Sequence, residues 1–318
     1  MVAGLGTTHN LPNYTGELFL LGQNTTPFLN LIGGINGANM PVVNSTEFSM
    51  GQGYALNAPS QPEISEEAST TAPAATHYGR EQETNVVQIF QRAIKLSYSK
   101  MGDANTVAGI NVLGQEQPVR NEKDFQISAN LAQMARDINY TFLHGAYQKP
   151  SSANVAAKTR GILTGITTKV VNNSAKAELS KEMLQELFRN CATDGFDFTN
   201  AVILADAYNV QKITDLYGFA PTDRKVGGMA IKQLLTDFGQ VMIVFEPSMN
   251  GTLGLFDMNK IAPVFRNIAG KGAGIFYEDL AKVGAAEHGQ LYGEVGLDYS
   301  SERFHGKITN LTTAPVGA

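Results

Sequence analysis

The sequence predicts an α+β fold with long extended segments, and three observations support this class. The stretch 121–148 has the apolar spacing of one long helix. The stretch 177–266 combines helical and strand patterns over short distances, and residues 44–100 contain the alternation that is typical of half-buried strands. There is no internal repeat, so a repeat architecture is not expected.

Residues 1–43 are expected to form an extended arm. Two short apolar clusters, Leu18 to Leu21 and Phe28 to Ile32, are separated by Gly, Asn, Thr and Pro without a sustained period. These clusters are too small to make a core of their own. We therefore expect them to dock on the rest of the chain or on a neighbouring molecule.

Residues 44–100 have the pattern of one long hairpin. Phe48 and Met50 flank Ser49, and apolar residues alternate with polar ones over 94–99. Between these strands, Asn57 to Gly79 is rich in Pro, Ser, Thr, Ala and Glu and has little that could pack. A strand of about 15 residues reaches roughly 50 Å, and two strands alone are marginally stable in water. The hairpin is expected to project and to lie on other chains; the alternative is a disordered surface insertion.

A single helix is predicted from Asn121 to about Gln148. Its apolar residues recur three or four positions apart on one stripe: Ile127, Leu131, Met134, Ile138 and Phe142. Asn121 can cap the helix and Pro150 follows its end. At about 1.5 Å per residue the helix is roughly 42 Å long, and the stripe indicates a core face.

Capping signals divide the compact region that begins at Ala177. Ser180 is the expected N-cap of a first helix, with Leu179 and Leu184 placed as a hydrophobic staple. A strand is predicted over Ala201 to Ala205, and Asp206 can cap a second helix that ends at Gly218.

The rest of this region is predicted to hold one more helix and several strands. The third helix carries Ile231, Leu234, Leu235 and Phe238 and ends before Gly239. Strands at 241–245 and 253–256 flank Asn250-Gly251, which is a strong hairpin signal. Further strands are expected at 292–299 and 304–309.

Composition and motifs argue against an enzyme, a metal protein and a nucleic-acid-binding protein. The net charge is -5 and only 17% of residues are charged, whereas phosphate binding needs a concentrated basic face. Gly270-Lys271 is only a near miss to a phosphate-binding loop, because Phe265 stands where the first glycine should be. The five histidines are far apart, so no metal or cofactor site is expected: His9, His77, His144, His288 and His305.

The single cysteine and an acidic pair complete the search for chemistry. Cys191 lies on the apolar face of its helix, where we expect a buried, inert thiol, and one cysteine excludes an internal disulfide framework. Asp194 is followed by Gly195 and indicates a turn before it indicates an acid–base group. No catalytic residue is expected. Nor does the chain contain the long apolar run of a membrane helix, so a protein made in a reducing cytoplasm is expected.

The order of these elements resembles that of the HK97-fold major capsid proteins of tailed bacteriophages (Caudoviricetes). Three short motifs occur in the order found in one phage subgroup. They are Thr26-Pro27-Phe28-Leu29 with a glycine pair after it, the segment PSMNGTLGLFD at 247–257, and Gly293-Glu294-Val295-Gly296-Leu297 followed by His305-Gly306. The resemblance covers nearly the whole chain.

The resemblance implies a division of the chain into five parts. These are an N-terminal arm at 1–43, an E-loop hairpin at 44–100, a peripheral domain with the spine helix at 101–176, an axial domain at about 177–285, and returning peripheral strands at 286–318. Assembly contacts are expected at seven residues of the arm and hairpin: Phe28, Leu29, Phe48, Tyr54, Leu56, Tyr78 and Arg80.

The resemblance also implies function and partners. The chain would assemble with itself into hexamers and pentamers of an icosahedral virion capsid, formed in the host cytoplasm around double-stranded DNA that is confined without sequence-specific binding. Cement, scaffolding and portal proteins are the further partners that it implies, and no membrane is expected. Some relatives cross-link through an E-loop lysine, but no lysine occurs between Ser45 and Gly79, so a noncovalent shell is expected.

Two alternatives remain open from the sequence. The same fold could form an encapsulin-like compartment around a cargo enzyme, and protein in place of DNA inside the particles would decide for it. An enzyme of unrecognised type is the less favoured alternative, and a reactive pocket in a structure without extended arms would support it.

Overall fold

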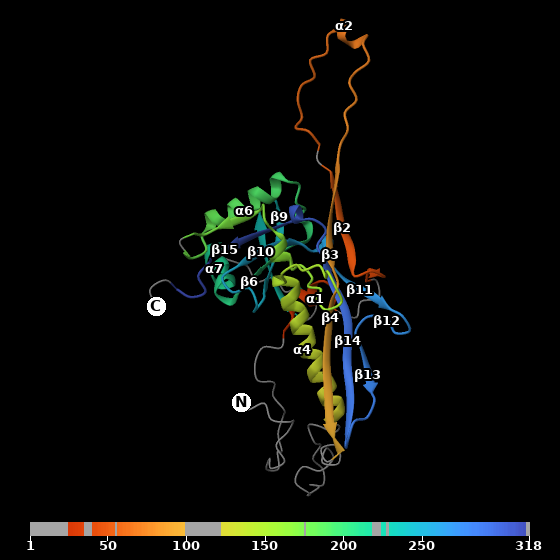
Figure 1. Ribbon diagram of the computed structural model, residues 1–318. Coiled ribbons are helices and arrows are strands. Elements are labelled where there is room, and N and C mark those ends of the chain that lie inside the picture. Colours follow the sequence, from red (N-terminus) through yellow and green to blue (C-terminus); the bar gives the residue numbers. More distant parts are fainter. Residues whose placement is uncertain are drawn as a thin grey trace.

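The computed structural model describes residues 25–34, 40–54, 56–98, 122–174, 176–217, 224–226 and 229–315. Two sheets lie side by side, and a narrow hairpin projects far beyond both of them (Figure 1). The arm residues 1–24, the 99–121 segment with Asn121, and Gly218 lie outside the described residues.

The helices are short except for α4, which runs alongside one sheet. They are α1 (Pro27–Leu31), α2 (Glu66–Ser69), α4 (Glu122–His144), α5 (Ile162–Gly165), α6 (Lys181–Thr193), α7 (Ala207–Tyr217) and the 3-10 turns η1 (Phe198–Asn200), η2 (Met258–Lys260) and η3 (Glu302–Phe304). The long helix expected at 121–148 is confirmed, although it ends at His144.

A six-stranded sheet is built around the longest strand, β14 (Ala286–Asp298). Its other strands are β1 (Val42–Val43), β4 (Gln88–Ser97), β11 (Ala262–Ile268), β12 (Gly272–Ala273) and β13 (Phe276–Leu280). The apolar stripe of α4 covers one face of this sheet, because Met134 and Ile138 share a buried cluster with Phe90 and Ile94 of β4.

A seven-stranded sheet has the order β5-β15-β10-β6-β9-β8-β7. Its strands are β5 (Val170–Asn172), β6 (Ala201–Ala205), β7 (Arg224–Val226), β8 (Met229–Thr236), β9 (Gly239–Phe245), β10 (Leu253–Asp257) and β15 (His305–Thr309). All five residues of the central strand β6 are buried. Ala201, Ile203 and Ala205 face the cluster of α6 and α7, while Val202 and Leu204 face the cluster of α4. This sheet is therefore covered on both faces.

The capping predictions at Ser180 and Asp206 are confirmed. The Ser180 hydroxyl accepts a hydrogen bond from the Met183 amide at 3.3 Å, and the Asp206 carboxylate accepts one from the Asn209 amide at 2.8 Å. Leu179 and Leu184 are both buried, as a hydrophobic staple requires.

The helix predicted over 231–238 is wrong, because this segment forms strand β8. Leu234 is buried while its neighbour Leu235 is 76% exposed, which is the two-residue alternation of a strand. Thr236 pairs with Gly239, whose φ of 149° suits the tight turn into β9. Pairing with β9 therefore overrides a spacing that would also suit a helix.

The hairpin predicted across Asn250-Gly251 is also wrong. The two residues do form a turn, and Gly251 has a φ of 63°, but β9 and β10 are not neighbours. Strand β6 lies between them, parallel to β9 and antiparallel to β10. A fully apolar strand from earlier in the chain fills the position that a hairpin partner would have taken.

The sheets divide the chain differently from the ranges expected from the sequence. Strand β4 pairs with β14, so only β2 (Glu47–Tyr54) and β3 (Arg80–Val86) form the projecting hairpin. Strands β11 to β13 belong to the six-stranded sheet, and β15 joins the seven-stranded sheet. Strand pairing across long sequence distances decides both assignments.

Candidate assembly surfaces

The base of the hairpin is tied to the body by one buried amide. Asn85 is 0% exposed, and its Nδ2 donates to the carbonyl oxygens of Leu297 at 2.8 Å and Arg160 at 3.2 Å. Its Oδ1 accepts from the amides of Arg160 at 2.8 Å and Val86 at 2.9 Å. The side chain is thus fully paired, which a buried amide requires.

Close packing and an ion pair add to this attachment. Phe48 lies against β14 where a Cβ at Gly296 would come within 2.8 Å of its ring. Glu47 forms an ion pair with Lys149 at 2.6 Å, and this contact lowers the pKa of the Glu47 carboxyl. The hairpin therefore leaves the body from a rigid base.

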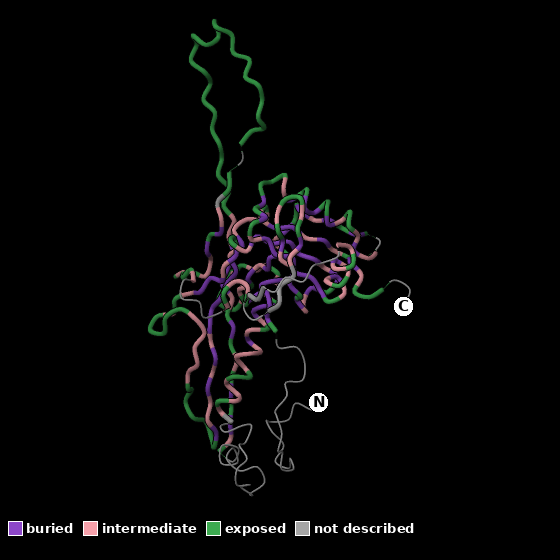
Figure 2. The backbone as a smooth tube through the Cα atoms, turned by 180° about the vertical axis from the view of Figure 1, so that it is seen from behind, coloured by how far each residue is buried: buried purple, intermediate pink, exposed green. Residues whose placement is uncertain are grey.

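Beyond that base the hairpin is exposed to solvent. Every described residue from 56 to 82 is exposed, and Figure 2 shows the tip as a continuous exposed loop away from the body. Its one helical turn, α2, is capped locally by Ser65, whose hydroxyl accepts from the Ala68 amide at 3.1 Å. Four large apolar side chains on this hairpin are at least half exposed: Tyr54, Leu56, Ile64 and Tyr78. Such a surface is costly in water unless another chain covers it.

The seven residues expected at assembly contacts fall into two groups. Three are at most 7% exposed and lie in the subunit's own core: Phe28, Leu29 and Phe48. Four lie exposed on the hairpin: Tyr54, Leu56, Tyr78 and Arg80. The first group serves the internal core, because the arm and the hairpin base dock on the same subunit. Only the second group is exposed in the single subunit.

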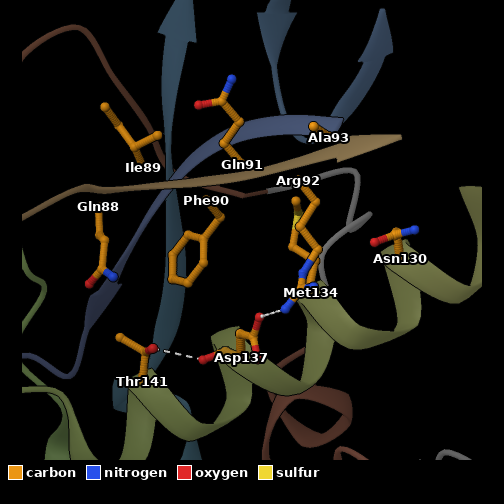
Figure 3. A pocket seen from close by; sticks show the side chains of 10 residues that line it. All are labelled: Gln88, Ile89, Phe90, Gln91, Arg92, Ala93, Asn130, Met134, Asp137 and Thr141. Atoms are coloured by element: carbon orange, nitrogen blue, oxygen red, sulfur yellow. Dashed lines mark hydrogen bonds and ion pairs between the residues drawn. The ribbon is translucent and has the colours of Figure 1, made fainter. Parts of the chain in front are cut away.

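A groove of about 570 Å³ lies where β4 passes over α4. Figure 3 shows Gln88, Phe90 and Arg92 pointing toward the helix, while Ile89 and Gln91 point away from it. Arg92 and Asp137 form an ion pair at 2.6 Å across the groove. The lining is mainly polar, and it includes amide groups that can bond an extended backbone.

Reactive and metal-binding side chains do not converge on one site among the described residues. These residues contain no cluster of His, Cys, Asp and Glu that could hold a metal ion. Cys191 is buried, and burial raises the pKa of its thiol to about 11. Burial also lowers the pKa of His305 to about 4. His77, His144, His288 and His305 are dispersed over different elements.

A projecting hairpin, a long helix on one sheet and a second, doubly covered sheet together form a distinctive architecture. The family model of the SU10 major capsid protein matches residues 1–312. This chain belongs to that family. It is a major capsid protein of the tailed-phage type, and the resemblance noted in the sequence is confirmed.

Solved structures support the HK97-like fold of this capsid protein. The cyanophage A-1(L) capsid matches with a TM-score of 0.63 and 12% identity, over 97% of this chain and 98% of that chain. The capsid of a native GTA particle matches with a TM-score of 0.58 and 13% identity, over 96% of this chain and 97% of that chain. The holo-SrpI encapsulin complex from Synechococcus elongatus PCC 7942 matches with a TM-score of 0.59 and 9% identity, over 97% of this chain and 95% of that chain. None of the curated proteins compared matches the chain.

The capsid protein's described helices include none that is both long and apolar enough to cross a membrane. Sequence reasoning missed its buried polar junctions around Asn85 and Glu246. Asn85 ends a run of polar residues and Glu246 lies between Phe245 and Pro247, so no local pattern distinguishes either residue from a surface one.

Proposed function

We propose that the protein assembles into hexamers and pentamers that close into an icosahedral virion shell around double-stranded DNA. Assembly takes place in the host cytoplasm, and the DNA is confined without being read. The observation that carries this proposal is the exposed hairpin, because every residue from 56 to 82 is exposed to solvent in the single subunit.

The hairpin of one subunit lies on its neighbour in this proposal. Residues 56–79 contain Glu63, Glu66 and Glu67 and no Lys or Arg, so the tip carries negative charge. Strand β4 pairs only with β14 among the described strands, and the face turned away from α4 presents Ile89 at 55% exposure together with the exposed Lys95. Opposite charge and exposed apolar area favour contact between this surface and the tip.

The contacts between subunits are noncovalent in this proposal. The segment 45–79 contains no lysine, so the amide cross-link of some relatives has no donor there. Stability then depends on buried area summed over many copies, with cement proteins as additional partners and with scaffolding and portal proteins during assembly.

Replacing residues 57–79 with an Asn-Gly turn tests the role of the hairpin. We expect a subunit with unchanged circular dichroism and thermal unfolding that forms no regular shells in electron micrographs. A finer comparison changes Leu56, Ile64 and Tyr78 to serine. Its matched control changes Leu280 and Val283, which are exposed elsewhere, to serine. Normal shells from the hairpin variants would contradict the proposal.

An encapsulin-like compartment is the second candidate function, because an encapsulin shares the fold at a TM-score of 0.59. The contents of purified particles distinguish the two. Nuclease-protected DNA supports the virion shell, whereas a co-purifying enzyme without DNA supports the compartment.

A further inference from the structure

A buried carboxylate without a cation lies at the boundary between the two sheets. Glu246 follows β9 and is 1% exposed, and no ion pair to it exists among the described residues. An isolated buried charge is costly unless it is well hydrogen-bonded. The surroundings of Glu246 therefore need to supply several donors.

Those donors come from three separate parts of the chain. Oε2 accepts from the Phe28 amide of α1 at 3.1 Å, and Oε1 accepts from Asn139 Nδ2 of α4 at 3.1 Å. Oε1 also accepts from the Ser248 hydroxyl at 2.6 Å and the Ser248 amide at 3.3 Å. One carboxylate thus joins the arm, the long helix and the seven-stranded sheet.

Asn139 completes the junction from the other side. It is 4% exposed, and its Oδ1 accepts from the Leu29 amide at 2.9 Å while its Nδ2 donates to Glu246. Two successive amides of α1 are therefore bound by two side chains that also bind each other. Such reciprocal pairing specifies one position for α1, which apolar contact alone would not do.

The apolar side chains of α1 fill the space between α4 and the seven-stranded sheet. Phe28 is 0% exposed, with its ring centroid 6.1 Å from that of Phe256 on β10. Phe28 and Leu29 share one buried cluster with Phe142 of α4 and Val244 of β9. Removing α1 would leave a cavity between the helix and the sheet that only a relative movement could close.

We infer that α1 is a latch. Its docking on the Asn139–Glu246 pair holds α4 and the seven-stranded sheet at one angle, and so couples the position of the N-terminal arm to the curvature of the shell. The angle between α4 and the seven-stranded sheet sets how each subunit meets its neighbours. The link to curvature rests on the proposed function, whereas the latch itself is a property of the single subunit.

A charge exchange tests the latch. Asn139→Asp replaces the donated hydrogen bond by two carboxyl groups in contact. At about pH 9, where the pair is least able to hold a shared proton, their mutual repulsion should release α1. Adding Glu246→Gln restores one donor and one acceptor, so the double variant should bind α1 again. Asn130→Asp is the control on the same helix, since the Asn130 side chain donates to the Gln126 carbonyl oxygen and has no hydrogen bond to α1 among the described residues.

Two measurements on the unassembled protein give the outcome. Amide hydrogen exchange in residues 25–34 should accelerate at least tenfold in Asn139→Asp and return toward the wild-type rate in the double variant. Spin labels at Ala129→Cys on α4 and Asn190→Cys on α6, both exposed, should give one narrow distance distribution in the parent protein and a broad one in Asn139→Asp.

Either of two results would overturn the latch. One is an unchanged exchange rate of residues 25–34 in Asn139→Asp, and the other is an equally accelerated rate in the single and the double variant. Released α1 with an unchanged label distance would overturn the claim that it sets the angle. Where shells form, Asn139→Asp should give mixed diameters by electron microscopy, and uniform wild-type diameters would overturn the link to curvature. A wild-type protein that forms no shells would count against the proposed function, and the two measurements would still decide the latch.

Discussion

The side-chain amide of Asn85 donates to the carbonyl oxygen of Leu297 at 2.8 Å and thereby joins the base of the hairpin to the end of β14. The two residues are 212 positions apart in the chain. A fixed base suits the proposed contact of the hairpin with other chains, because a mobile hairpin would lose more entropy on docking.

Asn85→Leu should destabilise the subunit by about 2–4 kcal/mol. The substitution leaves the carbonyl oxygens of Leu297 and Arg160, and two amides, without their buried partner, and each unsatisfied group costs about 1–3 kcal/mol before relaxation. Urea unfolding of the purified protein measures the change. Gln91→Leu is the control, because Gln91 is exposed and its side chain donates to that of Gln290 at the surface. If the unfolding free energies of Asn85→Leu and this control differed by less than about 0.5 kcal/mol, the Asn85 hydrogen bonds would not be needed for stability.

Gly161→Ala should destabilise the protein by roughly 1–3 kcal/mol, the usual cost of overpacking. A Cβ at this position would lie 2.5 Å from the Gly145 nitrogen and 2.7 Å from the Leu143 oxygen. Both are backbone atoms after or at the end of α4 and cannot rotate away. Gly53→Ala is the matched control, because a Cβ there meets nothing within 4 Å, and its melting temperature should stay unchanged or rise slightly.

Protonation of His305 should destabilise the folded protein in mild acid. Burial lowers the pKa of this imidazole from 6.5 to about 4, so the folded state favours the neutral ring. Its contribution to stability is complete above pH 6.5 and is lost as the pH falls from 6.5 toward 4; between pH 7.5 and 5 the loss is about 2 kcal/mol.

Replacing His305 with glutamine should remove this part of the pH dependence. The measurement is the difference in unfolding free energy between pH 7.5 and 5, for the wild type and for His305→Gln. The control is His288→Gln, because the His288 ring is only partly buried and lies beside the Val283 carbonyl oxygen. Equal pH dependence in the wild type and His305→Gln would contradict the assignment.

Cys191 should resist thiol reagents in the folded protein. Its side chain is 0% exposed, and burial raises the pKa of the thiol to about 11, so little thiolate exists at pH 8. We expect negligible reaction with a disulfide reagent over an hour at pH 8 and stoichiometric reaction in urea. Rapid labelling of the native protein would show that α6 opens locally.

Local patterns predicted those features that depend on neighbours in the sequence. The caps at Ser180 and Asp206 are confirmed because a hydroxyl or carboxylate bonds an amide three residues away. The stripe of α4 is confirmed because helical periodicity places its apolar residues on one face. The projecting hairpin was predictable because Asn57 to Gly79 has nothing to bury.

Strand partners were not predictable in the same way. Residues 231–238 fit a helical spacing, and only pairing with β9 makes them a strand. Asn250-Gly251 forms a turn as expected, but β6 takes the place next to β10. A turn signal specifies the local change of direction, and it does not specify which strand lies alongside.

The sequence by itself determined the class of fold, the order of hairpin, long helix and compact region, and the burial of Cys191 on the apolar face of its helix. Each of these follows from composition or from spacing along the chain. Only the tertiary structure decided that Phe28, Leu29 and Phe48 belong to the subunit's own core, and that Asn85, Asn139 and Glu246 are bonding centres. The physical reason is that burial and hydrogen-bond satisfaction depend on residues more than a hundred positions away, which no local pattern contains.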